Sequence, residues 1–249
     1  MAGVAFGAMR DSDLSMAEGV DWTVHVGDYW VVAGLQGAGK SDFLMLTGGL
    51  MPPLQGRYLL FGEEMPIFEE ARLHQRLRLG LVFDGGQLFN HLSVAENVAL
   101  PLRYHHNLSR SQAAAAVAAL LDCAELGPWA DSAPSDLGRS WQKRVGLVRA
   151  LALQPEVLLV DNPLGGLDLR HRHWWLGFLD QLSRGHSLTQ GKPVTLVVTT
   201  ADFRPWKSHA RKFAVLQNHR FVVLGVWEEL ESASEQLLQE LLTERSQPQ

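Results

Sequence analysis

The chain has 249 residues, of which 46% are hydrophobic and 20% are charged, and this length fits one α/β domain with a large insertion as well as two small domains. The 22 lysine and arginine residues and the 27 aspartate and glutamate residues are spread along the sequence, so there is no basic stripe of the kind that holds nucleic-acid phosphates, and we expect no nucleic-acid partner. The single cysteine, Cys123, has no internal disulfide partner, which favours a reducing, cytosolic compartment.

Membrane insertion is not expected from the sequence itself. Residues 1–19 carry several charged side chains and no apolar block, so they do not resemble a signal peptide. The most apolar stretch, residues 113–121, is too short to span about 30 Å of hydrocarbon. Any membrane association is therefore expected to come through a partner.

The first part of the chain predicts a strand, a glycine-rich loop and a helix. Alternating apolar residues over 20–26 indicate a strand, and the continuous apolar run over 29–33 indicates a second, fully buried strand. A glycine-rich loop follows at residues 34–41, and the apolar helical stretch behind it ends before Pro52. Short strands are expected at 57–61 and 79–83.

The middle of the chain is expected to be helical. Ser93 with Glu96, and Ser109 with Gln112, form the capping-box pattern that begins a helix. No strand pattern interrupts residues 93–153, so we predict a helical subdomain over approximately 90–153.

Strand patterns return in the last third of the chain. They cover residues 157–160, 194–199, 213–216 and 221–224, with a helix over 171–183 between the first two. We therefore predict a single α/β domain over 1–249. Its core, residues 1–89 and 154–230, holds a mixed, mainly parallel sheet with an antiparallel part, and a C-terminal helix occupies 231–249.

The glycine-rich loop matches the phosphate-binding pattern G-x-x-x-x-G-K-[ST] at Gly34, Gly39, Lys40 and Ser41. Its glycines let backbone N–H groups converge on phosphate oxygens at a helix N-terminus, where the peptide dipoles favour negative charge. The predicted nucleotide-binding residues are Gly34, Gln36, Gly37, Ala38, Gly39, Lys40, Ser41 and Asp42. The sequence thus predicts the P-loop NTPase core.

A nucleotide bound at this loop needs Mg²⁺ ligands as well. The Ser41 hydroxyl is one candidate, and Asp161, at the end of the predicted strand 157–160, is the second. Carboxylate and hydroxyl oxygens are the ligands that Mg²⁺ prefers. We therefore expect ATP and Mg²⁺ as cofactors.

Further segments resemble the nucleotide-binding subunit of ABC transporters over nearly the whole chain. Besides the phosphate loop and the strand ending in Asp161, they comprise residues 81–89, 92–102, 142–152 and 154–168. Residues 96–102, Glu-Asn-Val-Ala-Leu-Pro-Leu, look most like the Mla/MCE branch, which powers phospholipid traffic between bacterial membranes.

This resemblance implies an assembly. Two nucleotide domains sandwich two ATP molecules head to tail, each ATP lying between one chain's phosphate loop and the other's signature helix. Transmembrane permease subunits, and in the Mla/MCE branch an MCE substrate-binding protein, would be partners at the cytoplasmic face of the inner membrane. Residues 89–104 would receive the permease subunits, and an aromatic platform for adenine is expected upstream of the phosphate loop, with Phe6 as a candidate.

Several positions depart from the family's hydrolytic machinery. Asn162 stands where the family has the general-base glutamate, and an amide cannot accept a proton from water. Ala201, or Thr200 if the alignment shifts by one, replaces the switch histidine. Asp84 replaces the glutamine that senses Mg²⁺ and the lytic water; it could still ligate Mg²⁺ but places a negative charge near the γ-phosphate.

The signature also departs from the family's Leu-Ser-Gly-Gly-Gln. Arg139 and Trp141 add bulk where backbone should approach the partner's ATP, although Arg139 could pair with phosphate and Ser140 could cap the helix. The signature and dimer residues are Leu137, Gly138, Arg139, Ser140, Trp141 and Asp168.

Together these features predict a transporter subunit that binds ATP and hydrolyses it poorly. A heterodimer with an intact second nucleotide-binding subunit suits a working transporter better than a homodimer. Two alternatives remain from the sequence. One is an active ATPase in which Asp84 or a neighbouring acid is the base, and the other is an interaction protein in which ATP is structural.

Overall fold

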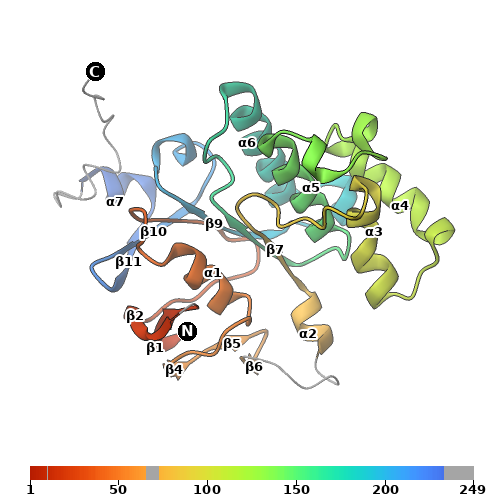
Figure 1. Ribbon diagram of the computed structural model, residues 1–249. Helices are drawn as coiled ribbons and strands as arrows, with labels where there is room; N and C mark the ends of the chain where they lie inside the picture. Colours follow the sequence, from red (N-terminus) through yellow and green to blue (C-terminus); the bar gives the residue numbers. More distant parts are fainter. Residues whose placement is uncertain (10, 66–72, 233–249) are drawn as a thin grey trace. The chain divides into compact units, whose positions relative to one another are not determined.

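The structure, a computed structural model, describes residues 1–9, 11–65 and 73–232 (Figure 1). The chain divides into two compact units. The first consists of Met1–Leu73 and Leu196–Gln249, and the second of His74–Thr195. The predicted C-terminal helix over 231–249 lies almost entirely outside the described residues.

The first unit is built on a sheet with parallel and antiparallel parts. Its strand order is β4 (Gln55–Arg57), β1 (Ala2–Ala8), β2 (Asp11–Val20), β11 (Arg220–Gly225), β10 (Lys212–Gln217), β3 (Tyr29–Ala33) and β9 (Thr195–Thr200). Strand β3 runs parallel to β10 and to β9, and each of its residues is buried, as predicted for the run 29–33. The antiparallel part consists of β1 with its neighbours β2 and β4, and of β10 with β11.

Smaller elements complete the first unit. They are the hairpin β5 (Leu59–Leu60) and β6 (Glu63–Glu64), the 3-10 turn η5 (Arg204–Trp206) and helix α7 (Trp227–Ser232).

Helix α1 (Lys40–Thr47) is fixed in the first unit by an aromatic core. The Phe43 ring is fully buried, and its centroid lies 6.0 Å from Phe6, 5.2 Å from Trp22 and 5.1 Å from Phe221. Burying rings of this size stabilises a core by about 1.5–3 kcal/mol each. The start of α1, and with it the end of the phosphate loop, is therefore held by tertiary packing.

The strand predicted over 20–26 is wrong. Strand β2 ends at Val20, and the chain is irregular from Asp21 to Val26. Trp22 is buried, whereas Val26 is 91% exposed, so the alternating apolar residues do not follow one sheet face. The hairpin of β1 and β2 was not predicted, because its sequence is rich in small and polar residues that carry little strand signal.

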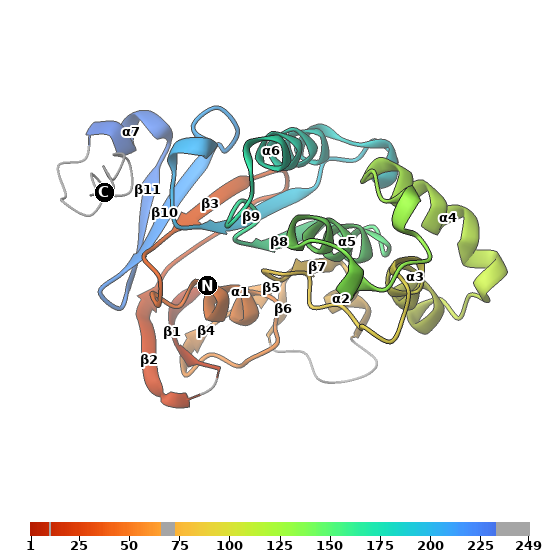
Figure 2. The same cartoon turned by 45° about the horizontal axis from the view of Figure 1, so that its top comes forward.

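The second unit combines a parallel strand pair with helices. Strands β7 (Leu79–Val82) and β8 (Val157–Asp161) pair in parallel, and helix α2 (Leu73–Leu77) precedes β7. Helices α3 (Val94–His105), α4 (Arg110–Cys123) and α5 (Arg139–Leu151) pack side by side (Figure 2). The remaining elements are α6 (Leu169–Arg184) and the 3-10 turns η2 (Gly127–Trp129), η3 (Pro134–Asp136) and η4 (Ser187–Thr189).

The predicted capping boxes are confirmed. Ser93 accepts a hydrogen bond from the Glu96 backbone N–H at 3.2 Å, and Glu96 accepts one in return from the Ser93 N–H at 2.9 Å. Ser109 and Gln112 make the same reciprocal pair at the start of α4. Each box satisfies backbone donors that a helix start leaves without an intrahelical acceptor.

Candidate functional site

The phosphate loop connects the buried strand β3 to helix α1 in the first unit. Gly37 and Gly39 adopt φ values of 83° and 85°, a left-handed conformation that glycine reaches at little cost. Gly39 is the N-cap of α1 and has no side chain to satisfy the first turn of the helix. The predicted strand, loop and helix are thus present, and a helix N-terminus without a side-chain cap lies at the end of the loop.

The loop also touches its neighbours closely. A Cβ placed on Gly34 would lie 2.7 Å from the Leu216 carbonyl oxygen on β10, and one on Gly39 would lie 3.0 Å from the Met16 Cβ on β2. Neighbouring backbone therefore sets the path of the loop.

Gly34→Ala is expected to disturb the loop because the Leu216 carbonyl cannot yield as a flexible side chain would. We expect a loss of about 1–3 kcal/mol in the free energy of unfolding and weaker nucleotide binding, measured by denaturant unfolding and calorimetric titration. Gly177→Ala is the matched control, since a Cβ there meets nothing within 4 Å and alanine favours a helix. Equal stability of the two variants would contradict the packing argument.

Two charged side chains in the first turn of α1 have partners within the first unit. The Lys40 ammonium donates to the carbonyl oxygens of Gly34 at 2.7 Å and Leu35 at 2.8 Å. The Asp42 carboxylate accepts a hydrogen bond from the Met9 N–H at 2.9 Å, so it ties α1 to the turn between β1 and β2.

In the second unit, strand β8 ends in Asp161, which is 8% exposed, and then turns sharply. Asn162 has a φ of 45°, and its carbonyl accepts a hydrogen bond from the Gly165 N–H at 3.2 Å. A Cβ on Gly165 would clash with the Asn162 amide, so this side chain lies against the turn. Asparagine tolerates the left-handed conformation better than most residues.

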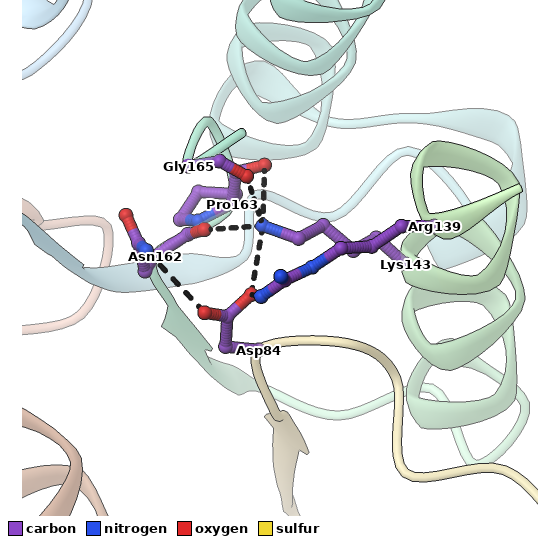
Figure 3. A network of polar contacts seen from close by, with 6 residues as sticks. All are labelled: Asp84, Arg139, Lys143, Asn162, Pro163 and Gly165. Atoms are coloured by element: carbon purple, nitrogen blue, oxygen red, sulfur yellow. Dashed lines mark hydrogen bonds and ion pairs between the residues drawn. The ribbon is translucent and has the colours of Figure 1, made fainter. Parts of the chain in front are cut away.

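Asp84 lies in a network of polar contacts with α5 and this turn (Figure 3). Its Oδ1 is 2.9 Å from the Lys143 Nζ and 3.0 Å from an Arg139 nitrogen, and its Oδ2 accepts from the Asn162 amide at 3.4 Å. The Lys143 ammonium also donates to the carbonyl oxygens of Asn162 at 2.7 Å and Gly165 at 2.9 Å. The Lys143 ammonium is therefore surrounded by oxygen atoms of Asp84, Asn162 and Gly165.

Burial and charge act in opposite directions on these groups. Burial alone would raise the pKa of the Asp84 carboxyl, but the hydrogen bonds and charges of Lys143 and Arg139 outweigh it and hold this pKa below its ordinary value. Burial lowers the pKa of the Lys143 ammonium, and Asp84 opposes that shift. At neutral pH the pair is an ion pair.

The lowered pKa of Asp84 predicts a pH dependence. Its contribution to stability is present above the ordinary aspartate pKa of about 3.9 and is lost as the pH falls through the lower pKa of the folded state. Asp84→Asn is expected to lower the free energy of unfolding by about 1–3 kcal/mol at pH 7, and this difference should shrink only below about pH 4. Denaturant unfolding at several pH values measures it; a difference that vanishes by pH 6 would contradict this ion pair.

Comparison with known proteins identifies the family. The family model described as "ABC transporter" matches residues 17–165. The methionine import ATP-binding protein MetN 2 of Rhodococcus jostii (strain RHA1) is 32% identical over 241 residues, which cover 94% of this chain and 69% of that protein. The chain belongs to the ABC transporter family. It contains the ATP-binding domain of that family.

A second relative is also an import ATP-binding protein. The spermidine/putrescine import ATP-binding protein PotA of Trichodesmium erythraeum (strain IMS101) is 32% identical over 213 residues, covering 86% of this chain and 53% of that protein. The chain thus spans about half of the length of this relative.

Solved structures show the same fold. A dimeric ATP-binding cassette described as a post-hydrolysis state bound to ADP and Pi superimposes with a TM-score of 0.77 at 25% identity, covering 88% of this chain and 94% of that one. The protein cbiO1 from Clostridium perfringens, described as part of the ABC transporter complex cbiONQ, has a TM-score of 0.75 at 20% identity, covering 94% and 90% of the two chains. The predicted P-loop NTPase fold is confirmed by these cassettes.

The residues predicted to form the signature, 137–141, lie at the start of α5. Leu137 is buried, and Gly138, not Ser140, is the N-cap, without a side-chain hydrogen bond. Arg139 pairs with Asp84 of its own chain. The prediction that Ser140 caps the helix is wrong, because the helix begins one residue before Ser140 is reached.

Trp141 packs into a cation–aromatic stack. The Arg144 guanidinium, which is fully buried, lies 4.5 Å from the Trp141 ring and 3.8 Å from the Trp174 ring. Arg144 also pairs with Glu125 at 2.9 Å and contacts His171 Nδ1 at 3.1 Å. Such contacts are worth about 0.5–2 kcal/mol each, so they join α5 to α6.

The remaining predicted site residues lie at element ends. Asp168 is the N-cap of α6 and accepts from the His171 N–H at 2.9 Å. Ala201 follows β9 and is exposed. Thr200 is buried, and its hydroxyl donates to the Asp202 carbonyl at 3.0 Å, so it is turned toward its own loop.

Phe6 does not suit the expected adenine platform. Its ring is 0% exposed and packs against Phe43, so a base could not stack on it without opening the core. Sequence reasoning also missed Lys143 and Arg149. The signal for Lys143 was a charged residue on the apolar face of a predicted helix.

Among the described residues, each helix is too short or too polar to cross a bilayer.

Proposed function

We propose that the chain is the ATP-binding subunit of an ABC transporter and holds Mg-ATP through residues 34–41. The uncapped N-terminus of α1 at the end of this loop carries the proposal. On binding, the Lys40 ammonium exchanges the Gly34 and Leu35 carbonyl oxygens for phosphate oxygens of the nucleotide. The Ser41 hydroxyl and the Asp161 carboxylate have the oxygen chemistry that Mg²⁺ requires.

We further propose that this chain hydrolyses its own ATP slowly. Asn162 offers an amide where a base is needed, and the methyl group of Ala201 cannot donate to a phosphate. The alternative base, Asp84, is held as an ion pair with Lys143 and Arg139, which stabilises its ionised form and weakens it as a proton acceptor. A missing base costs about 10²- to 10⁴-fold in rate.

The assembly we propose contains a second nucleotide-binding subunit with intact catalytic residues and two transmembrane permease subunits. The permeases contact residues 89–104, where Phe89 is 46% exposed and Tyr104 is 75% exposed. The dimeric structural relative supports the pairing. Through these partners the chain is located at the cytoplasmic face of the membrane.

For the cargo we propose phospholipid in an MCE-type system with an MCE substrate-binding protein. The support for an MCE-type system is the segment 96–102 alone, which resembles the Mla/MCE branch of the family. The names of the relatives favour a second candidate, import of a small solute, since they are import proteins for methionine and for spermidine or putrescine.

The test is to purify the native complex from membranes, identify its subunits and assay its ATPase with Lys40→Ala in this chain alone. An MCE-domain protein in the complex supports lipid cargo, and a small-solute-binding protein supports the second candidate. ATPase activity that survives Lys40→Ala supports hydrolysis at the partner's site. A complex without permease subunits would contradict the transport function.

A further inference from the structure

The loop that follows β7, residues 84–88, lies directly against α5. A Cβ on Gly146 of α5 would lie 2.7 Å from the Gly86 Cα, and one on Gly86 would lie 2.5 Å from the Gln142 carbonyl oxygen. The two backbones meet without side chains between them. Gly85, Gly86 and Gln87 all have positive φ values, so this path needs the glycines.

Charged side chains fix both ends of the same loop. At its start, Asp84 pairs with Lys143 and Arg139. At its other end, Arg149 donates to the carbonyl oxygens of Gly86 at 2.7 Å and Gln87 at 2.9 Å. Arg139, Lys143, Gly146 and Arg149 recur at spacings of three and four residues, so they form one face of α5.

Phe89, the residue after this loop, is hydrogen-bonded to Asn97 on α3. The Asn97 side chain, which is 0% exposed, accepts from the Phe89 N–H at 2.9 Å and donates to the Phe89 carbonyl at 3.0 Å. Polar contacts therefore link α3 to residue 89, and α5 to residues 84, 86 and 87. From Lys143 they continue to the turn at Asn162 and Gly165 (Figure 3).

We infer that Asp84 anchors an electrostatic clamp, formed with Arg139, Lys143 and Arg149, that makes residues 84–89 one rigid piece with α5. Asp84 then serves as a positioning residue and not as a Mg²⁺ ligand or a base. Its Oδ1 is shared by two cations, and its Oδ2 faces the Asn162 amide. All residues of the clamp belong to the second unit.

The clamp has a consequence that rests on the proposed function. If a permease contacts residues 89–104, a displacement of α3 reaches the start of α5 and the turn after β8 through the clamp instead of being absorbed by a flexible loop. Such coupling requires that both ends be held, and Asn97 and Asp84 hold them.

Hydrogen–deuterium exchange of the full chain tests the clamp. Asp84→Asn and Lys143→Met are each expected to speed amide exchange in residues 84–89 at least tenfold, with exchange in α4 unchanged. The effect of combining the two substitutions should be smaller than the sum of their separate effects, because both remove the Asp84–Lys143 pair. Asp131→Asn is the matched control, an exposed acid of the same unit, and should leave exchange unchanged.

Two further variants keep the test decisive if a buried substitution prevents folding. Arg139→Ala removes a side chain that is 62% exposed, and Arg149→Met removes the donors to the loop carbonyls; both should loosen residues 84–89. Wild-type protection should persist in 1 M salt, since the Lys143 side chain is only 2% exposed.

Unchanged exchange in residues 84–89 of folded Asp84→Asn or Arg149→Met would overturn the clamp. So would a tenfold loss of Mg²⁺-dependent ATP affinity in Asp84→Asn with normal exchange, because that identifies Asp84 as a metal ligand. Failure of the proposed function is separate: it would appear as absent ATP binding in the wild type, with the exchange pattern of these variants unaffected.

Discussion

Replacing Lys40 with alanine is expected to weaken ATP binding by about 10- to 100-fold. The ammonium is the charged donor of the phosphate loop, and hydrogen bonds of charged groups are worth about 1.5–3 kcal/mol. In the structure this ammonium already bridges the carbonyl oxygens of Gly34 and Leu35, so it is positioned over the loop. Calorimetric titration with Mg-ATP measures the loss.

Lys207→Ala is the matched control for Lys40→Ala. Lys207 is an exposed lysine of the same unit whose ammonium lies 5.2 Å from the centre of the Trp227 ring. Its removal should leave the affinity for ATP within about twofold. Undiminished ATP binding by Lys40→Ala would refute the assignment of residues 34–41 as the nucleotide site.

The phosphate loop could be predicted because its structure is determined locally. Gly34, Gly39 and Lys40 stand at fixed spacings that only a few backbone conformations satisfy. The same is true of the caps at Ser93 and Ser109, where each donor and acceptor lie three residues apart. Hydrogen bonds between residues that are close in the sequence can therefore be predicted from the sequence pattern.

Elements that depend on distant partners left no such pattern. Strand β1 pairs with β4 and strand β2 pairs with β11, both farther along the chain, and the small and polar residues of β1 and β2 resemble loop sequence. The Asp84 network was not predicted either, because Lys143 is far away in the sequence and meets Asp84 only when α5 packs beside β7. Asp84 alone suggested a ligand or a base, and the structure shows it paired with two cations.

Asn162→Glu is expected to leave turnover within about tenfold of the wild-type rate, which we propose to be slow. A positioned base supplies about 10²- to 10⁴-fold in rate, and two features of this turn oppose such positioning. The φ of 45° costs a non-glycine residue about 1–2 kcal/mol, and asparagine is better suited to it than glutamate. The Asn162 amide nitrogen lies 3.4 Å from the Asp84 Oδ2 and donates to it. A glutamate at position 162 would replace this donor by a carboxylate, and the two negative charges would repel each other. In addition, Ala201 still lacks a donor for phosphate.

The same substitution is therefore expected to destabilise the chain by about 2–4 kcal/mol, measured by denaturant unfolding beside a phosphate-release assay. Asn218→Glu provides the matched control, since Asn218 has a φ of 46° in an exposed turn and tests the backbone cost alone. We expect Asn218→Glu to lower the free energy of unfolding by only about 1 kcal/mol. The additional loss of stability in Asn162→Glu then measures the repulsion from Asp84 together with the lost packing against Gly165. Removing that repulsion in the double variant Asn162→Glu with Asp84→Gln should recover part of the stability. A rise in turnover of 10²-fold or more from Asn162→Glu alone would show that the rest of the hydrolytic site is intact, contrary to the proposed impairment.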